Sequence, residues 1–160
     1  MFELLPQVKV QWASGPEQAD DWVASTPGLV VSRASVLRAN LSAAENIAWV
    51  PMFLQNLDRT QALSRAHGLL HLLGLQGAAG MRDAQLSSTQ RAGVLLLQSL
   101  AQGLVEDWWI DRPAILLPDA NHPKILATWL QALAPHYGRC TVVDYDWNMP
   151  LYGPADPDAR

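Results

Sequence analysis

Residues 86–91 read Leu86-Ser87-Ser88-Thr89-Gln90-Arg91, and they open a long helix-forming segment. That segment carries a wide apolar stripe, formed by Val94, Leu95, Leu96, Leu97, Leu100, Leu104 and Trp108. Such a stripe predicts a helix that is buried along much of its length. Upstream, Ser42 and Glu45 have the spacing of a capping box, which predicts the start of another helix. A further helix ending at Gly74 completes an all-helical segment.

Short apolar runs on both sides of this helical segment predict β-strands. They lie within residues 2–12, 29–32, 114–117 and 140–145. Helices are expected after the turn at Ser14-Gly15-Pro16 and from Pro123 to Leu133. Alternating strands and helices predict an α/β fold with a parallel sheet. We expect one domain over residues 1–150, with a helical subdomain over about 42–104 and a loose Pro/Asp-rich tail over 151–160.

The composition narrows the classes of function. The chain has 160 residues, of which 49% are apolar, so a real core is expected. The formal net charge of −4 argues against a nucleic-acid partner, because phosphate contact needs a clustered basic face. A single cysteine, Cys140, rules out an internal disulfide and a four-cysteine zinc site. There is no signal segment and no apolar run long enough for a membrane span, so a cytoplasmic location is expected.

Two motifs and the segment between them resemble the ATP-binding cassette family. Residues 86–91 resemble its signature loop, and residues 42–47 resemble the segment that leads into its helical subdomain. Residues 61–75 carry the Ala, Leu and Arg pattern and the closing Leu-Gly-Leu of such subdomains. Residues 31–42 are similar to the ATPase subunits of Mce-associated lipid and solvent-tolerance transporters. The resemblance implies a truncated P-loop NTPase-like parallel sheet core with an inserted helical subdomain, without the antiparallel sheet that stacks adenine.

The turn after the first predicted strand stands where the family has its phosphate-binding loop (Walker A). Such a loop needs glycines, a lysine and a magnesium-binding hydroxyl. Of these, Gly15 remains, but Gln18 stands in place of the lysine and Ala19 in place of the hydroxyl. Glu17, Asp20 and Asp21 add negative charge, and reversing a unit charge about 4 Å from a phosphate is worth about 4 kcal/mol at an effective dielectric of about 20. The other interpretation is an ordinary strand–turn–helix; neither interpretation predicts good ATP binding.

The paired carboxylates of the family, one for magnesium and one for the attacking water, fit two registers. If residues 108–113 are the relevant strand and turn, Arg112 replaces the catalytic glutamate. If residues 114–119 are the relevant strand and turn instead, Asp119 is a shortened substitute for that glutamate. We favour the second register, because Glu106 and Asp107 would fit a buried parallel strand poorly.

The switch histidine of the family also has a different residue in its place. Residues 143–146 read Val143-Asp144-Tyr145-Asp146, so Tyr145 stands where the family has histidine. The glutamine that precedes the helical subdomain is replaced by Ser32 or Arg33. The resemblance therefore implies a degenerate cassette without a working catalytic residue, in which Asp119 and Tyr145 are vestigial, and no cofactor is expected.

One rival site is a pair of histidines. His67 and His71 have the i, i+4 spacing that could place two imidazoles on one metal ion. Leucines surround them, so two partly buried, hydrogen-bonded histidines without a metal are the favoured interpretation. A metal-dependent enzyme built on this pair is the third candidate function.

The resemblance implies a pseudo-ATPase that acts as a structural or regulatory partner in transport. Its partners would be a permease subunit, through the helical subdomain, or an active ATPase subunit; a homodimer is also compatible. A protein partner would then attach the chain to the cytoplasmic face of the inner membrane. Ser87, Ser88, Thr89 and Gln90 would touch ATP held by the opposing subunit, although Ser88 and Thr89 replace two glycines of the family. The alternative is a weak ATPase, with ATP as ligand, that uses Asp119 or Asp144.

Overall fold

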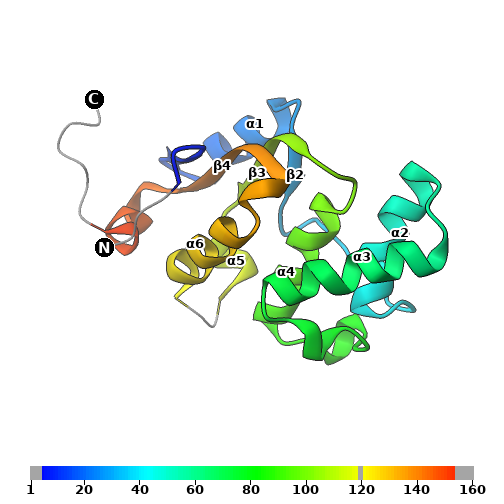
Figure 1. The fold of residues 1–160 in the computed structure, drawn as a ribbon. Coiled ribbons are helices and arrows are strands. Elements are labelled where there is room, and N and C mark those ends of the chain that lie inside the picture. Colours follow the sequence, from blue (N-terminus) through cyan, green and yellow to red (C-terminus); the bar gives the residue numbers. More distant parts are fainter. Residues whose placement is uncertain (1–4, 119–120, 154–160) are drawn as a thin grey trace.

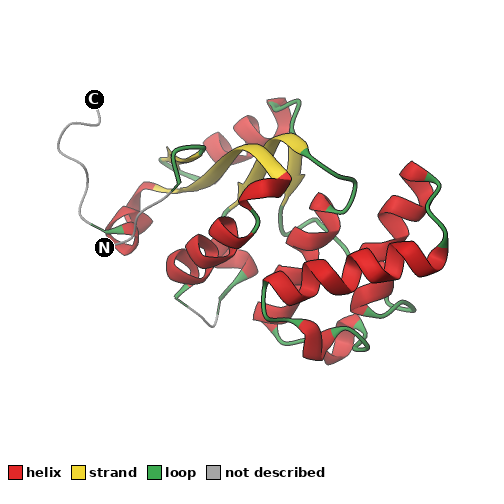
Figure 2. Cartoon of the chain, viewed as in Figure 1, coloured by secondary structure: helices red, strands yellow, loops and turns green. Residues whose placement is uncertain are grey.

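The centre of the computed structural model, which describes residues 5–118 and 121–153, is a four-stranded parallel sheet (Figures 1 and 2). Its strands are β1 (Val8–Ala13), β2 (Leu29–Val31), β3 (Val105–Asp111) and β4 (Tyr137–Tyr145). They are hydrogen-bonded in the order β1-β4-β3-β2. Each neighbouring pair is parallel, so the carboxyl ends of β1, β3 and β4 meet at one edge of the sheet.

Helices cover both faces of the sheet, as a parallel sheet requires. Helix α1 (Pro16–Ser25) lies on one face, where Ala19 packs against Ala13 and Val143 in a small core. The other face carries the main core, against α4 (Ser88–Leu100), α5 (Pro113–Leu116) and α6 (His122–Ala132). Short 3-10 helices, η3 (Ala134–His136) and η4 (Asp146–Tyr152), flank β4.

The alternation of side chains along the strands explains these two cores. In β3 and β4 the buried members of the main core are Trp108, Ile110, Cys140 and Val142. The residues between them point to the α1 face. Trp108 is fully buried, and its indole N–H donates to Ser99 Oγ of α4 at 3.0 Å. That bond satisfies the polar end of the largest fully buried side chain.

The inserted helices form a second half of the molecule beside the sheet (Figure 1). They are α2 (Ala43–Gln55), α3 (Arg59–Leu72), the 3-10 turns η1 (Gln76–Ala78) and η2 (Asp83–Gln85), and then α4. The predicted capping box of Ser42 with Glu45 is present, and the structure adds a second one, Ser87 with Gln90, at the start of α4. The buried Asn46 holds the loop before α2 by accepting from the N–H of Arg38 and donating to three carbonyl oxygens. The predicted α/β fold with a helical insertion is confirmed.

Two predicted elements differ from the structure. Residues 114–117, predicted as a strand, lie in or directly after helix α5, which Pro113 starts at its first position. The long helix predicted to reach Trp108 ends at Leu100, and Gly103, with φ of 119°, turns the chain into β3. Glu106 and Asp107 are therefore in a strand, where the side chain of Glu106 is exposed and the partly exposed Asp107 is paired with Arg139.

The first residues of the predicted loose tail are structured. Leu151 belongs to η4, and Tyr152 of the same element is buried. The remaining residues of that prediction lie outside the described part of the chain, except Gly153. Within residues 5–118 and 121–153, no helix combines the length and apolarity needed to cross a lipid bilayer.

Candidate functional site

Arg112 is the centre of a buried ion-pair network at the carboxyl edge of the sheet. Its guanidinium donates to both carboxylate oxygens of Asp111, at 2.8 and 2.9 Å, and to Asp20 Oδ1 at 2.6 Å. It also donates to the hydroxyl of Tyr145 at 3.3 Å. Asp20, Asp111, Arg112 and Tyr145 are named the Arg112 cluster below. The cluster joins α1, the end of β3 and the end of β4.

The backbone of Arg112 is fixed as tightly as its side chain. Its φ of 45° and ψ of 68° are left-handed, a conformation that costs a non-glycine residue about 1–2 kcal/mol. Its N–H donates to the carbonyl oxygen of Val143 at 2.7 Å. This bond and the four side-chain bonds offset that cost.

Burial makes the charges of this cluster interdependent. The side chains of Arg112 and Asp111 are 7% and 2% exposed, whereas that of Asp20 is 57% exposed. The hydrogen bonds that Arg112 donates to Asp111 raise the pKa of Arg112 above its already high usual value, and burial opposes this only in part. The guanidinium is therefore permanently charged, and Asp111 has a fixed cation beside it.

The turn between β1 and α1 is only two residues long, Ser14 and Gly15, and the side chain of Gln18 fills it. Gln18 Oε1 accepts from the backbone N–H of Ser14 at 2.8 Å and from its hydroxyl at 3.1 Å. Ala19 is fully buried, with its methyl group against the sheet. The donors of Ser14 are thus used inside the chain, and position 19 presents no oxygen.

The structure decides between the two registers considered for the paired carboxylates. Asp111 ends β3 beside β4 and Arg112 follows it, which matches the register that was not favoured from the sequence. The favoured register is wrong about the strand, because residues 114–116 are helical. Asp119 itself lies outside the described residues. Gln18, Ala19, Arg112 and Tyr145, singled out separately from the sequence, are gathered at one end of the sheet.

A second polar cluster lies beside the first, on the opposite face of β4. Asp144 is fully buried and accepts from Tyr152 Oη at 2.7 Å, Asn148 Nδ2 at 2.9 Å and the N–H of Tyr145 at 2.8 Å. His122 Nε2 of α6 lies 3.4 Å from Asp144 Oδ2, the oxygen that also accepts from Tyr152. Burial raises the pKa of Asp144, but these hydrogen bonds together lower it below the usual value. The cluster anchors η4 and α6 to the sheet.

Residues 87–90, predicted to meet ATP in trans, form the first turn of α4. Ser87 is its N-cap, with Gln90 N donating to Ser87 Oγ at 3.2 Å and Ser87 N donating to Gln90 Oε1 at 2.9 Å. Ser88 and Thr89 are the first helical residues. This turn lies in the helical half, where an isolated bridge joins Ser42 to Arg82, and no described hydrogen bond connects it to the Arg112 cluster.

The two candidate metal ligands of α3 are not in a metal-binding setting. His67 and His71 are both exposed, so the expectation of two partly buried histidines was wrong. The helix turns the surrounding leucines, Leu69 and Leu70, into the core and leaves the imidazoles outside. Among the residues that the structure describes, no group of three or more His, Cys, Asp or Glu side chains could hold a metal ion.

The Arg112 cluster predicts a steep loss of stability when the guanidinium is removed. We expect Arg112→Ala to lower the free energy of unfolding by about 3–5 kcal/mol, because Asp111 would remain buried without a partner. Arg112→Lys should cost less, since it keeps the charge but loses the fork geometry. Urea denaturation measures these values. Asp21→Asn is the matched exposed control, and a cost below about 1 kcal/mol for Arg112→Ala would contradict the burial of this charge.

The Asp144 cluster predicts a pH-dependent contribution to stability. Because the folded-state pKa of Asp144 is below its ordinary value of 3.8, the stabilisation is complete above that pH and is lost as the pH falls below it. Asp144→Asn should therefore cost about 2 kcal/mol near neutral pH, and this difference should shrink at about pH 3. Urea denaturation at several pH values, with the exposed Asp146→Asn as control, makes the comparison. A difference that stays constant with pH would assign the titration to another group.

Comparisons with known proteins find sequence similarity to ATP-binding proteins of transporters. No family model matches the sequence. The methionine import ATP-binding protein MetN of Rhizobium johnstonii is 34% identical over 92 residues, which are 58% of this chain and 22% of MetN. The macrolide export ATP-binding/permease protein MacB of Rhodospirillum rubrum is 37% identical over 111 residues, which are 68% of this chain and 16% of MacB. The chain thus spans about a fifth of the length of these relatives.

Solved structures show the same fold. A dimeric structure of the bacterial ABC transporter cassette MJ0796 superposes with a TM-score of 0.61 at 22% identity, over 79% of this chain and 55% of the other. A dimeric post-hydrolysis state of MJ0796 bound to ADP and Pi gives a TM-score of 0.60 at 23% identity, over 78% and 55%. Motifs, relatives and fold agree: the chain belongs to the ATP-binding cassette family of ABC transporters, as a partial and distant member.

Proposed function

We propose that this chain is a non-hydrolysing, cassette-like subunit that acts as a structural or regulatory partner in a transport assembly. The observation that carries the proposal is the Arg112 cluster. Arg112 follows the aspartate at the end of β3, where the family has the glutamate that polarises water. A guanidinium cannot accept a proton from water, and here it is bound to three neighbouring side chains. The position therefore has a structural role in place of a catalytic one.

The turn after β1 supports the same proposal. A phosphate-binding loop works by directing free backbone N–H groups, a lysine and a hydroxyl at the nucleotide. In this chain Gln18 accepts the N–H of Ser14, and the buried methyl group of Ala19 offers no ligand for magnesium. The exposed carboxylates of Glu17 and Asp21 would repel a triphosphate. These features disfavour ATP and its metal together.

The alternative function, a weak ATPase that uses Asp144, has little geometric support. A general base must reach the water that it activates. Asp144 is fully buried, and its two oxygens are engaged by four described groups. The other carboxylate of that alternative, Asp119, lies outside the described residues and is tested by mutation below.

A surface on α2 supports docking to a permease subunit. Trp49 and Phe53 stack with ring centroids 6.1 Å apart, and Phe53 is 74% exposed. The guanidinium of Arg38 lies 4.6 Å above the Trp49 ring. Exposed Trp, Phe and Arg side chains are the ones that most often anchor protein interfaces. We assign the apolar face of a permease's cytoplasmic helix as the occupant of this surface.

The first turn of α4 supports a second partner in the same assembly. Ser87 and the N–H groups of Ser88 and Thr89 are at a helix N-terminus, which favours anions. They are the residues proposed to meet a nucleotide that an active cassette holds. The paired cassettes of the MJ0796 structures are a precedent for such an arrangement.

The direct test is a nucleotide titration. Calorimetry of the full chain with Mg-ATP up to about 5 mM should give no binding heat, corresponding to a Kd weaker than millimolar. A competent cassette serves as the positive control in the same buffer. Saturable heat that Asp119→Ala abolishes would establish the weak ATPase and overturn the proposal.

The partner half of the proposal is tested by isolating the complex from the native cells under mild detergent. We expect mass spectrometry to identify a permease or an ATP-binding subunit with intact catalytic motifs. Phe53→Ser should reduce permease recovery about tenfold or more, as expected for an aromatic interface anchor. Thr60→Ser, on an exposed position of α3, is the control. A monomer with no transport subunit attached would contradict the assignment.

A further inference from the structure

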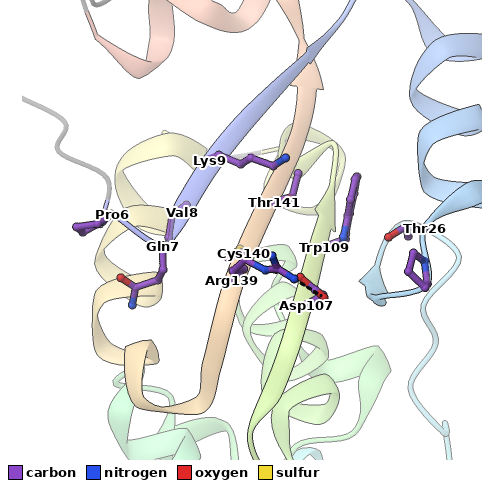
Figure 3. Close-up of a pocket in the computed structure, with 11 residues that line it drawn as sticks. Pro6, Gln7, Val8, Lys9, Thr26, Asp107, Trp109, Arg139, Cys140 and Thr141 are labelled. Carbon is purple, nitrogen blue, oxygen red and sulfur yellow. Dashed lines mark hydrogen bonds and ion pairs between the residues drawn. The ribbon is translucent and has the colours of Figure 1, made fainter.

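Part of the α1 face of the sheet has no cover among the described elements. Helix α1 packs over the carboxyl-end rows, where Ala13 and Val143 lie beneath it. At the other end of the same face is an open pocket of about 410 Å³. It is bordered by the turn at Pro6-Gln7 on one side and by Thr26-Pro27 on the other (Figure 3). This volume is within the range of small-ligand sites.

The strand register sets the floor of this pocket. Lys9 of β1 is paired with Thr141 of β4, and Thr141 is paired with Trp109 of β3. The three side chains therefore form one row across three strands, on one face, with neighbouring strands about 4.8 Å apart. Figure 3 shows the Lys9 side chain reaching across β4 towards Thr141, with the Trp109 ring standing on the far side.

In the next row, towards the amino ends of the strands, the two charges are paired with each other. Arg139 and Asp107 are paired in register, and the guanidinium makes two bonds to the carboxylate, at 2.8 and 3.0 Å. The charge of Arg139 is thereby matched by Asp107. Lys9, by contrast, has no hydrogen bond or ion pair with any residue that the structure describes, so among these residues it is the cation of the pocket without a carboxylate partner.

The other two residues of the row, Thr141 and Trp109, also carry hydrogen-bond donors. Within residues 5–118 and 121–153, neither the Thr141 hydroxyl nor the Trp109 indole N–H takes part in a hydrogen bond. Together with Lys9 they present three donors, while Asp107, the one carboxylate that lines the pocket, is held by Arg139. This pattern recognises a negatively charged oxygen acceptor.

The aromatic wall of the pocket is held in place. A Cβ added to Gly28 would lie 2.9 Å from Trp109 Cδ1 and 2.8 Å from the carbonyl oxygen of Asp107. Because Gly28 has no side chain, the turn that precedes β2 can pack directly on the indole of Trp109. A fixed, partly buried indole favours a flat apolar group beside it.

From this arrangement the geometry points to a binding site for a small anion with a planar apolar body, such as an aromatic carboxylate. Its carboxylate is bound by Lys9 and Thr141, and its ring packs along Trp109 at the far side of the row. The site is independent of the proposed transport function. It lies about two residues, or roughly 7 Å, along the strands from the row that contains Asp111.

Titration of the full-length, ¹⁵N-labelled chain with 2-naphthoate tests the site. The indole N–H resonance of Trp109, assigned as the one that Trp109→Phe removes, should shift saturably at millimolar concentration. The neutral 2-naphthamide should bind about tenfold more weakly, because it lacks the charge that strengthens these hydrogen bonds. Inorganic phosphate should also bind at least tenfold more weakly than naphthoate, because it has no ring.

Matched variants separate the site from a general charge effect. Lys9→Gln should weaken naphthoate binding about tenfold, and Thr141→Val severalfold with no change in the other indole resonances. The sequence contains one other lysine, Lys124, which is exposed on α6, so Lys124→Gln removes the same charge elsewhere and should leave binding unchanged. Equal affinity in Lys9→Gln, equal affinity for the amide or for phosphate, or no shift by about 10 mM would overturn the inference. So would saturable binding of an acidic peptide in place of naphthoate.

Discussion

A single buried guanidinium constrains the carboxyl edge of this sheet. Arg112 is bound to Asp111 of its own strand, to Asp20 of α1 and to Tyr145 of β4. A buried charge is tolerated only when its hydrogen-bonding capacity is used, so each of these elements must keep its position for the others to be stable. The left-handed backbone at Arg112 is held by the same region, because its N–H donates to the carbonyl oxygen of Val143 in β4.

The end of β4 connects the Arg112 cluster to the other face of the sheet. Successive residues of a strand point to opposite faces, so Tyr145 reaches the Arg112 cluster while Asp144 enters the main core. The buried carboxylate of Asp144 then holds His122 of α6 and Tyr152 of η4. Two adjacent residues thus connect α1 with the segments beneath the sheet. Both clusters use polar side chains of the candidate site for structure, which is the physical basis for proposing a non-catalytic role.

The sequence allowed the local elements to be predicted better than the site. Ser42 with Glu45 is a local signal, and α2 begins where it predicts; α4 also begins at the predicted place, directly after Ser87. Strand β3 was missed because Glu106 and Asp107 argue against a buried strand, yet Asp107 is stabilised by Arg139 on the neighbouring strand. Arg112 and Tyr145 could each be singled out by resemblance. Their contact with Asp20 could not, because it depends on how α1 packs on strands that are distant in sequence.

The two ends of the α1 face differ in how their charges are satisfied. At the carboxyl end, the donors of Arg112 are matched by acceptors of the chain itself, and the donors of Ser14 by Gln18. At the other end, Lys9, Thr141 and Trp109 lie in one row with no acceptor of their own among the described residues. These donors reach solvent, and an anionic ligand would replace water as their acceptor with charge-assisted hydrogen bonds. On this face, the groups available to bind a ligand are therefore the donors that the chain itself does not pair. They lie away from the carboxyl edge of the sheet, where Arg112 and Ser14 are already paired.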